Sequence, residues 1–366
     1  MPDESVWIEI GDRVRESRLS AGLSQEQLAR RISSERSKIA KIESGTRQIN
    51  AVELTRLAAA LGMPIGHFLY ARPEVISRRT PLDEDTTSPA ARQSYRIEAA
   101  LTAWLRDVRD VRELGCLRSP EPLRYPKKVS DAADARAAAR WVRERLSLGT
   151  EPISTMMSAC EKAGQLILVT DLPGDGASVV DDELAVAVVS RRGDPGRRRA
   201  TAAHELGHLV LGDEYSSDLG GGVAAARGER EAVVDAFAAE FLLPIQALRA
   251  TARCEDLRTA LIVSAAEYRT SWTLAVCQAG VAGLIEPTGL KRWRAAPKPT
   301  RAEMMQAVGW APQPDFERVC VPPSYADAVL SAWRARRLTA RRAVELMHGQ
   351  LSIEDLGPVD EDVTEP

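Results

Sequence analysis

Residues 197–214 read RRRATAAHELGHLVLGDE and contain two of the four histidines in the 366-residue chain. His204 and His208 are four residues apart, so on a helix they lie one turn apart on one face, where two imidazoles can bind the same metal ion. Glu205 is directed toward the open side of that metal, where a carboxylate polarises bound water. The stretch therefore predicts a helix that carries most of a catalytic zinc site. The alternative is a surface helix with two unrelated histidines.

A catalytic zinc ion usually takes three protein ligands, so one more is needed. The other two histidines fall in unrelated helical segments, which favours a carboxylate as the third ligand. Residues 229–244, EREAVVDAFAAEFLLP, offer Glu229 and Glu231 at the start of a predicted helix. Asp235 follows Glu231 by one turn and is placed to accept an N–H from a ligating histidine. Acidic residues also favour helix N-termini through the helix dipole, so spacing alone leaves both glutamates open as ligands.

The two segments together, RRRATAAHELGHLVL and E-x-x-x-D-x-FAAEFLLP, resemble the ImmA/IrrE family of zinc metallopeptidases, which share the gluzincin arrangement. The resemblance covers residues 95–290 and implies a zincin-like domain with Glu205 as the general base. The zinc ligands that it implies are His204, His208 and Glu231. Glu231 is preferred to Glu229 because the family's glutamate stands six residues before the Phe of FAAEFLLP. Asp235 falls where the family has Asn or Asp.

One departure from the family pattern leaves the oxyanion partner open. Many members carry a further histidine shortly after HExxH, and here that position is Gly212. The tetrahedral intermediate of peptide hydrolysis needs a donor for its oxyanion. Tyr215 and Arg199 are candidates by proximity in the sequence, and the alternative is that both are ordinary surface residues.

The N-terminal segment LSQEQLARRISSERSKIAKIESG, residues 23–45, has the organisation of a helix-turn-helix. Ser24 and Gln27 form a capping-box pattern at the start of a short helix. A tight turn then precedes a second helix with polar residues on its outer side. Residues 9–69 resemble the Cro/repressor-type (XRE-like) helix-turn-helix family, most specifically in LSQEQLA, KIESG and LAAALGM.

The local charge of this segment suits contact with phosphates. Residues 13–47 carry nine Lys or Arg against four Glu, a local charge of +5 in a chain of net charge −3. The resemblance implies double-stranded DNA as a partner, bound by a homodimer with the second helix of the motif in the major groove. The candidate DNA contacts are Gln25, as a phosphate anchor, and Glu35, Arg36, Ser37, Lys38 and Lys41, at or near the bases. The alternative is a helical protein-interaction module with a solvated charged face.

A length of 366 residues predicts two or three folded units. Aromatic residues make up only 5%, and Ala and Arg are abundant, which favours a mainly helical protein. No apolar stretch approaches the ~18 residues of a membrane span, and the start lacks a signal-peptide pattern. Five cysteines without CxxC spacing argue for a reducing compartment. We therefore expect a cytoplasmic protein that does not associate with a membrane.

The expected architecture is mainly α with a small β-sheet (α+β). The best strand candidates are QLILVT (165–170) and ELAVAVVS (183–190), with the turn PGDG between them. The predicted domains are a helix-turn-helix domain at 1–70, a linker at 71–93, a metallopeptidase-like domain at 94–290 and a helical C-terminal region with an acidic tail at 291–366.

These features predict a DNA-binding regulator with a zinc-dependent endopeptidase domain. In the family that it resembles, peptidases cut helix-turn-helix repressors after stress or mobile-element signals, so the implied substrate is a repressor-type protein, in trans or the chain itself. A second hypothesis is a regulator whose metallopeptidase-like domain senses a metal or a ligand and cuts nothing. A third, an antitoxin-like partner protein, leaves the zinc motif unused. The joint presence of both histidines, Glu205 and a third carboxylate favours the first.

Overall fold

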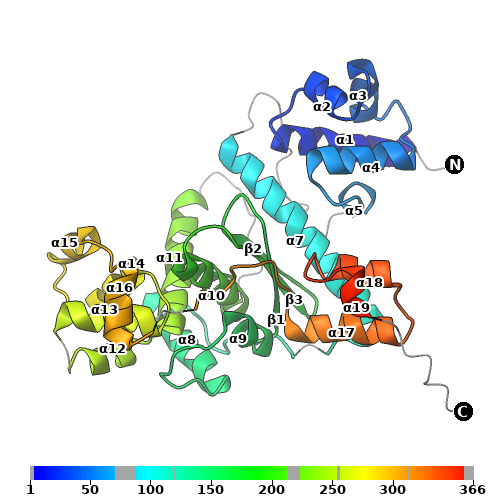
Figure 1. The fold of residues 1–366 in the computed structure, drawn as a ribbon. Helices are drawn as coiled ribbons and strands as arrows, with labels where there is room; N and C mark the ends of the chain where they lie inside the picture. The colour runs from blue at the N-terminus through cyan, green and yellow to red at the C-terminus, as the bar shows by residue number, and fades with distance from the viewer. Residues whose placement is uncertain are drawn as a thin grey trace, which may run out of the picture. The chain divides into compact units, whose positions relative to one another are not determined.

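A computed structural model of the chain describes residues 4–70, 88–118, 120–212, 223–253, 256–310 and 313–357. The chain divides into two compact units. The first comprises Met1–Arg106 and Leu172–Gly174, and the second comprises Asp107–Asp171 and Asp175–Pro366. Helices dominate both units and the second contains a small sheet (Figure 1), so the predicted α+β class is confirmed.

The first unit is a set of short helices around an apolar core. Its helices are α1 (Glu4–Ser20), α2 (Gln25–Arg31), α3 (Arg36–Glu43), α4 (Ala51–Leu61) and α5 (Gly66–Leu69). Ser24 and Gln27 form the predicted capping box at the start of α2, an arrangement worth about 1 kcal/mol relative to an alanine cap. Val14, Leu28 and Leu57 are fully buried in the core. The pair α2–α3 is the predicted helix-turn-helix.

Helix α7 (Pro89–Glu113) continues from the first unit into the second. Tyr95, in its first half, is buried in the core of the first unit. The Tyr95 hydroxyl lies 3.2 Å from the Ser17 hydroxyl and 2.8 Å from Nε2 of His67. The first half of α7 thus packs with the helix-turn-helix, whereas the sequence assigns most of this helix to the next domain. Most of the predicted linker, 71–93, lies outside the described residues, and the domain boundaries stay a prediction.

The second unit is built around a sheet with strand order β1-β3-β2. β1 (Gln165–Thr170) pairs parallel with β3 (Leu184–Ser190), and β2 (Gly176–Asp181) pairs antiparallel with β3. The two predicted strands are confirmed. The sequence does not predict β2, because its residues GASVVD are mostly half-buried and alternate only weakly. Asp182, with a φ of 52°, helps to form the tight β2–β3 turn, so PGDG leads into β2 and not directly into β3.

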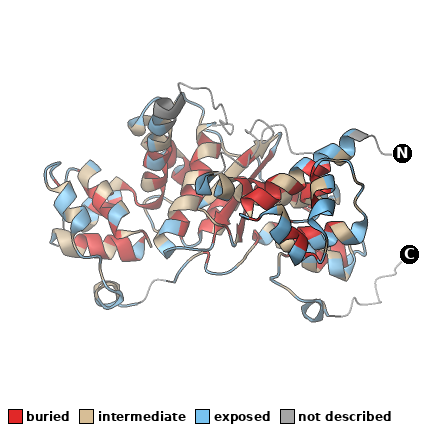
Figure 2. Cartoon of the chain, turned by 90° about the horizontal axis from the view of Figure 1, so that it is seen from above, coloured by how far each residue is buried: buried red, intermediate tan, exposed pale blue. Residues whose placement is uncertain are grey.

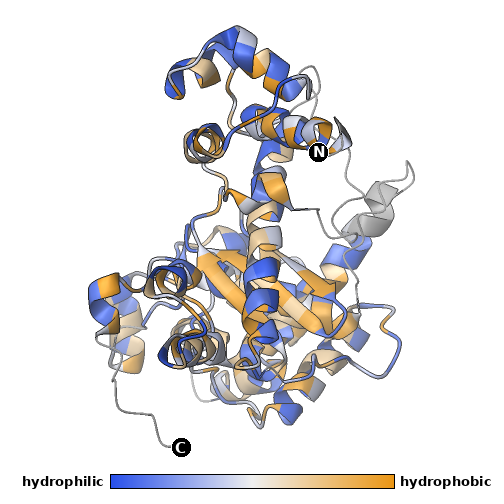
Figure 3. Cartoon of the chain, turned by 90° about the vertical axis from the view of Figure 1, so that its right-hand side faces the viewer, coloured by the Kyte–Doolittle hydropathy of each residue, from blue (hydrophilic) through white to orange (hydrophobic). Residues whose placement is uncertain are grey.

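Helix α10 (Pro195–Leu211) carries the HELGH motif and packs against the sheet (Figure 1). Pro195 at the first position starts this helix, and Gly212, with a φ of 73°, ends it. The strands of this sheet are among the most buried and most apolar parts of the chain (Figures 2 and 3). Helix α11 (Val223–Leu242) packs beside α10 and against α8 (Ala132–Arg145). This packing places two helices of the predicted site side by side.

The second unit contains further helices. They are α9 (Met156–Lys162), α12 (Ile245–Thr251), α13 (Leu257–Glu267), α14 (Trp272–Val281), α15 (Leu290–Ala295), α16 (Arg301–Val308), α17 (Pro323–Arg334), α18 (Ala340–Leu346) and α19 (Ile353–Leu356). Helices α12 to α16 share a core that includes Leu261 and Trp272. Among the described residues, no helix combines the length and the hydropathy that a membrane span requires.

Candidate metal centre and nucleic-acid interface

Helices α10 and α11 bring the three predicted metal ligands to one point. The Nε2 atoms of His204 and His208, on α10, lie 3.1 Å apart. Oε2 of Glu231, on α11, lies 3.0 Å from Nε2 of His204 and 3.9 Å from Nε2 of His208. Tetrahedral zinc bonds of about 2.0–2.1 Å separate two ligand atoms by about 3.4 Å, so these spacings and this set of donors fit a zinc ion.

Asp235 lies where it can orient His204. Its Oδ1 atom is 2.9 Å from Nδ1 of His204, and a carboxylate at this nitrogen directs Nε2 toward a metal. Burial alone disfavours the charged imidazole, but hydrogen bonds to Asp235 and Glu231 outweigh it and raise the pKa of His204 to about 10. These two carboxylates thus favour the protonated imidazole of His204 at neutral pH when no metal is bound.

Zinc binding is expected to release about one proton from His204 at neutral pH, because Nε2 must lose its proton before it can donate a lone pair. The pKa of about 10 lies above neutral, so the proton is present before binding at pH 7 and the release vanishes as the pH rises through that value. Calorimetric titration of zinc in buffers of different ionisation enthalpy counts the protons. Asp235→Asn is expected to lower this pKa and the release at pH 8, and no release from wild type at pH 7 would contradict the arrangement.

Glu205 is held by a residue that the sequence does not single out. Its Oε2 atom accepts a hydrogen bond of 2.7 Å from the hydroxyl of Ser178 on β2, and the residue is buried. Gly176, two residues earlier on β2, packs too closely for a side chain, since a Cβ there would lie 2.7 Å from the Val188 carbonyl oxygen and 2.8 Å from Cγ2 of Thr201. The only signal in the sequence is the i, i+2 spacing of Gly176 and Ser178, which is too short to identify a site without the strand pairing.

His204 and Glu205 line one pocket with a volume of about 340 Å³. Its other lining residues are Asp175, Gly176, Arg197, Ala200, Thr201 and Asp235. Arg197 and Asp175 form an exposed ion pair at its edge, with Nη2 and Oδ2 2.6 Å apart. A candidate metal ligand, a carboxylate base and the beginning of β2 therefore face the same space.

Arg199 does not join this pocket. It precedes His204 by five residues, which turns it about 140° away around α10. Its side chain is fully buried, pairs with Asp315 and donates to the Ile153 carbonyl oxygen at 3.2 Å. The structure thus engages Arg199 elsewhere, and an oxyanion role for it has no support. Tyr215, the other candidate, lies outside the described residues.

In the first unit, α3 presents the predicted DNA contacts on its outer side. The exposed residues at its start and along it are Glu35, Arg36, Ser37, Lys38 and Lys41. Ile39 and Ile42, on its inner side, are buried in the core. This division leaves a polar face that is free to enter a groove.

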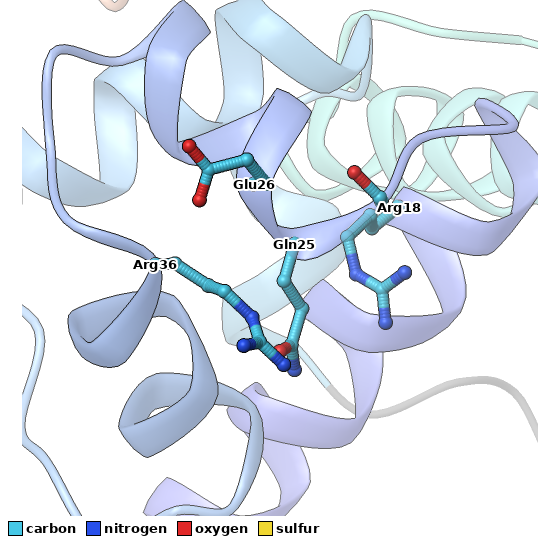
Figure 4. Close-up of a pocket in the computed structure, with 5 residues that line it drawn as sticks. Arg18, Gln25, Glu26 and Arg36 are labelled. Atoms are coloured by element: carbon cyan, nitrogen blue, oxygen red, sulfur yellow. The ribbon is translucent and has the colours of Figure 1, made fainter.

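A buried ion pair fixes α3 relative to the preceding helices. Nε of Arg18, on α1, lies 2.6 Å from Oε1 of Glu43, with both side chains at most 5% exposed. Gln25, on α2, donates a hydrogen bond of 2.9 Å to the other oxygen of Glu43. Arg18, Gln25 and Arg36 line one hollow of about 530 Å³ (Figure 4). Gln25 and Arg36 therefore border the same hollow, which Glu26 also lines.

Two family models match separate parts of the chain. Residues 160–269 match the IrrE N-terminal-like domain of peptidase family M78. Residues 9–67 match a helix-turn-helix domain. The chain combines a helix-turn-helix domain with an IrrE N-terminal-like domain. Both resemblances seen in the sequence are thereby confirmed.

Comparison with whole proteins gives shorter or weaker matches. An uncharacterized transcriptional regulator in the ATPase CF(0) region of Rhodospirillum rubrum is 44% identical over 59 residues, which is 16% of this chain and 55% of that protein. The chain thus spans about half the length of the curated relative that it matches. The crystal structure of ComR from Streptococcus suis aligns over 93% of this chain and 87% of that chain, at 13% identity and a TM-score of 0.17.

The IrrE N-terminal-like domain contains the whole candidate centre. Within the part of the chain that the structure describes, His204, His208 and Glu231 are the group of side chains that could hold a metal ion, with ligand atoms within 4.8 Å of one another. Glu205 and Ser178 belong to the same matched segment. The predicted ligands of this domain therefore lie close together. Ser178, which the sequence does not single out, contacts the predicted base Glu205.

Proposed function

We propose that this protein is a DNA-binding regulator whose IrrE N-terminal-like domain is a zinc-dependent endopeptidase. Its substrate would be a repressor-type protein, either a separate one or the chain itself, and cleavage would relieve repression in a stress or mobile-element response. The helix-turn-helix domain and the metallopeptidase-like domain are present; the zinc, the cleavage and its target are the proposed part. We place the protein in the cytoplasm, where its DNA would be.

The observation that carries this proposal is the position of Glu205. Its carboxylate lines the same pocket as the ligand His204 and is fixed by the Ser178 hydroxyl at 2.7 Å. A metal sensor needs ligands, but it does not need a positioned base beside them. In the described sheet β2 is an edge strand that begins at Gly176, in the wall of the pocket. An extended peptide that pairs with this edge would pass the base.

Zinc at this centre would supply a Lewis acid for the scissile carbonyl and a water of lowered pKa. Glu205 would take the proton of the attacking water and pass it to the leaving amine. Ser178 would keep the carboxylate of Glu205 turned toward the pocket. Asp235 would hold Nδ1–H of His204, so that Nε2 stays directed at the metal.

The test is metal analysis of the purified protein together with incubation against helix-turn-helix repressors encoded near its gene. Stoichiometric zinc and a discrete cleavage that a chelator abolishes would support the proposal. Zinc without cleavage under activating conditions would favour the alternative, a regulator whose metallopeptidase-like domain is a metal or ligand sensor.

Arg36→Ala is expected to weaken operator binding by about 1–3 kcal/mol and to relax the preference at one base pair, because Arg36 is exposed at the start of the proposed recognition helix. Arg56→Ala, which removes an exposed arginine on α4, is the charge-matched control and should cause a smaller loss that is the same for all sequences. Fluorescence anisotropy with operator and scrambled DNA measures both. If Arg36→Ala weakened binding to operator and scrambled DNA equally, Arg36 would contact the phosphates and not the bases.

We also propose a homodimer on a near-palindromic operator, as the helix-turn-helix geometry favours. Sedimentation of the protein with and without operator DNA measures the stoichiometry. One chain per full operator would contradict the dimer.

A further inference from the structure

The second unit contains another cavity, larger than the one at the metal centre, with a volume of about 700 Å³. It lies where the start of α10 meets the segments around α14 and α16, and it shares no lining residue with the pocket beside His204. A cavity of this size can enclose a small organic molecule. The reaction proposed for Glu205 makes no use of it.

The deep part of this cavity carries an excess of positive charge. Arg199 and Arg269 both form ion pairs with the one carboxylate of Asp315. Arg199 is fully buried, and the side chains of Arg269 and Asp315 are 15% and 13% exposed. Burial lowers the pKa of Arg199 to about 10, so it stays protonated at neutral pH. The buried Arg199 and the partly exposed Arg269 thus share one carboxylate, and a second anion would balance the remaining positive charge.

Two buried polar atoms in the cavity wall are also left without a hydrogen bond. They are Nε of Arg199 and Oγ1 of Thr270, and the latter residue is 5% exposed. A buried donor without a partner costs free energy, and such groups in a cavity wall mark a place for a polar ligand or ordered water. Arg199 belongs to the arginine pair, and Thr270 directly follows Arg269 in the chain.

The rim and the opposite wall add charge and apolar surface. Lys298 and Arg301 are exposed at the rim, and neither has an acidic partner within the described residues. Asp194 and Glu317, which are also exposed, line the cavity too, so its lining holds one more cationic side chain than acidic ones. The apolar lining includes Ala265, Trp272 and Met304. The cavity therefore offers cationic and hydrogen-bond-donating groups for an anionic head group, and an aromatic wall for the apolar part of a ligand.

We propose that this cavity is a binding site for a small organic anion, with an oxyanion head at Arg269, Thr270 and the rim cations and an apolar body against Trp272. A carboxylate and a phosphate share this head-group chemistry. The site does not depend on zinc or on cleavage, because none of its residues belongs to the metal centre. Binding would give the regulator a second input beside its candidate metal site.

Calorimetry on the full-length protein, freed of metal by a chelator, tests the site with phenyl phosphate and phenylacetate as probes. At least one probe is expected to bind with a Kd on the order of 1 mM or tighter, and the tighter one identifies the head group. Inorganic phosphate and phenol, which carry the head or the body alone, are each expected to bind at least about tenfold more weakly.

Variants that keep the buried ion pairs locate the binding. The double variant Lys298→Gln with Arg301→Gln is expected to weaken the better probe by about tenfold or more, and Thr270→Val, which is nearly isosteric, by several-fold. Lys291→Gln with Arg292→Gln removes two exposed charges of α15 outside the cavity and should change the affinity less than about twofold. No binding of either probe up to about 10 mM, equal binding to all variants, or equal binding of inorganic phosphate would each overturn the proposal.

Discussion

Glu205→Gln is expected to leave zinc bound and to lower the rate of repressor cleavage by about 10²–10⁴-fold, the range typical of a lost general base. Glutamine has nearly the same shape and can still accept the hydrogen bond from the Ser178 hydroxyl, which measures 2.7 Å in the wild-type protein. It cannot take a proton from water at neutral pH. The zinc content and the rate of product formation, measured on the same preparation, separate the two effects.

Ser178→Ala is the graded companion of this variant. It removes the hydroxyl that fixes Glu205 but leaves the carboxylate, so we expect a smaller loss of about tenfold in cleavage and no loss of zinc. If the Glu205→Gln variant cleaved the repressor at the wild-type rate, Glu205 would not be the general base. That result would not disturb the assignment of the metal ligands.

Glu231→Ala is expected to lower the zinc affinity by more than about 100-fold, because loss of a direct ligand should exceed the 10- to 100-fold effect of losing an outer partner. Oε2 of Glu231 lies 3.0 Å from Nε2 of His204 and is the oxygen donor of the proposed centre. The same change removes a carboxylate that favours the protonated imidazole of His204. Competition with a chromophoric chelator gives the affinity, and cleavage should be lost together with the zinc.

Glu229→Gln is the matched control, since Glu229 is exposed near the same end of the described part of α11 and spacing alone leaves it equally eligible as a ligand. It should bind zinc as the wild type does. If Glu229→Gln lowered the zinc affinity strongly and Glu231→Ala did not, Glu229 would be the third ligand in place of Glu231.

Together the variants separate the two hypotheses for the IrrE N-terminal-like domain. A peptidase loses cleavage in both Glu205→Gln and Glu231→Ala, but loses zinc only in the second. A sensor without proteolysis shows the same difference in zinc and no cleavage in any variant, wild type included. The anion site proposed in the larger cavity can be present or absent under either hypothesis.

What the sequence predicted well was local. The spacing of His204 and His208 depends only on the pitch of a helix, and the capping box at Ser24 depends only on residues within one turn, so both could be predicted from neighbouring letters. The helix-turn-helix and the IrrE-like segment could be identified for the same reason, because their motifs are short and continuous. Gly212 ends α10 where its missing side chain permits a positive φ.

What the sequence could not predict depends on contacts between distant segments. Ser178 reaches Glu205 only because β2 forms an antiparallel edge on β3, and the strand is too weakly patterned to be predicted. Tyr95 joins the helix-turn-helix core through a helix that the sequence assigns to the next domain.

The sequence by itself determined that His204 and His208 share one face of a helix, because the helical period sets that face. It left Glu229 and Glu231 both open as the third ligand, and the family resemblance favoured Glu231. Only the tertiary structure decided which of the surrounding residues serve that site. Arg199 stands beside the motif in the sequence, yet helical rotation turns it to the opposite side, where it meets Asp315 from 116 residues away. Side-chain direction on a helix is local, but the partner that a side chain finds is set by how the chain folds back on itself.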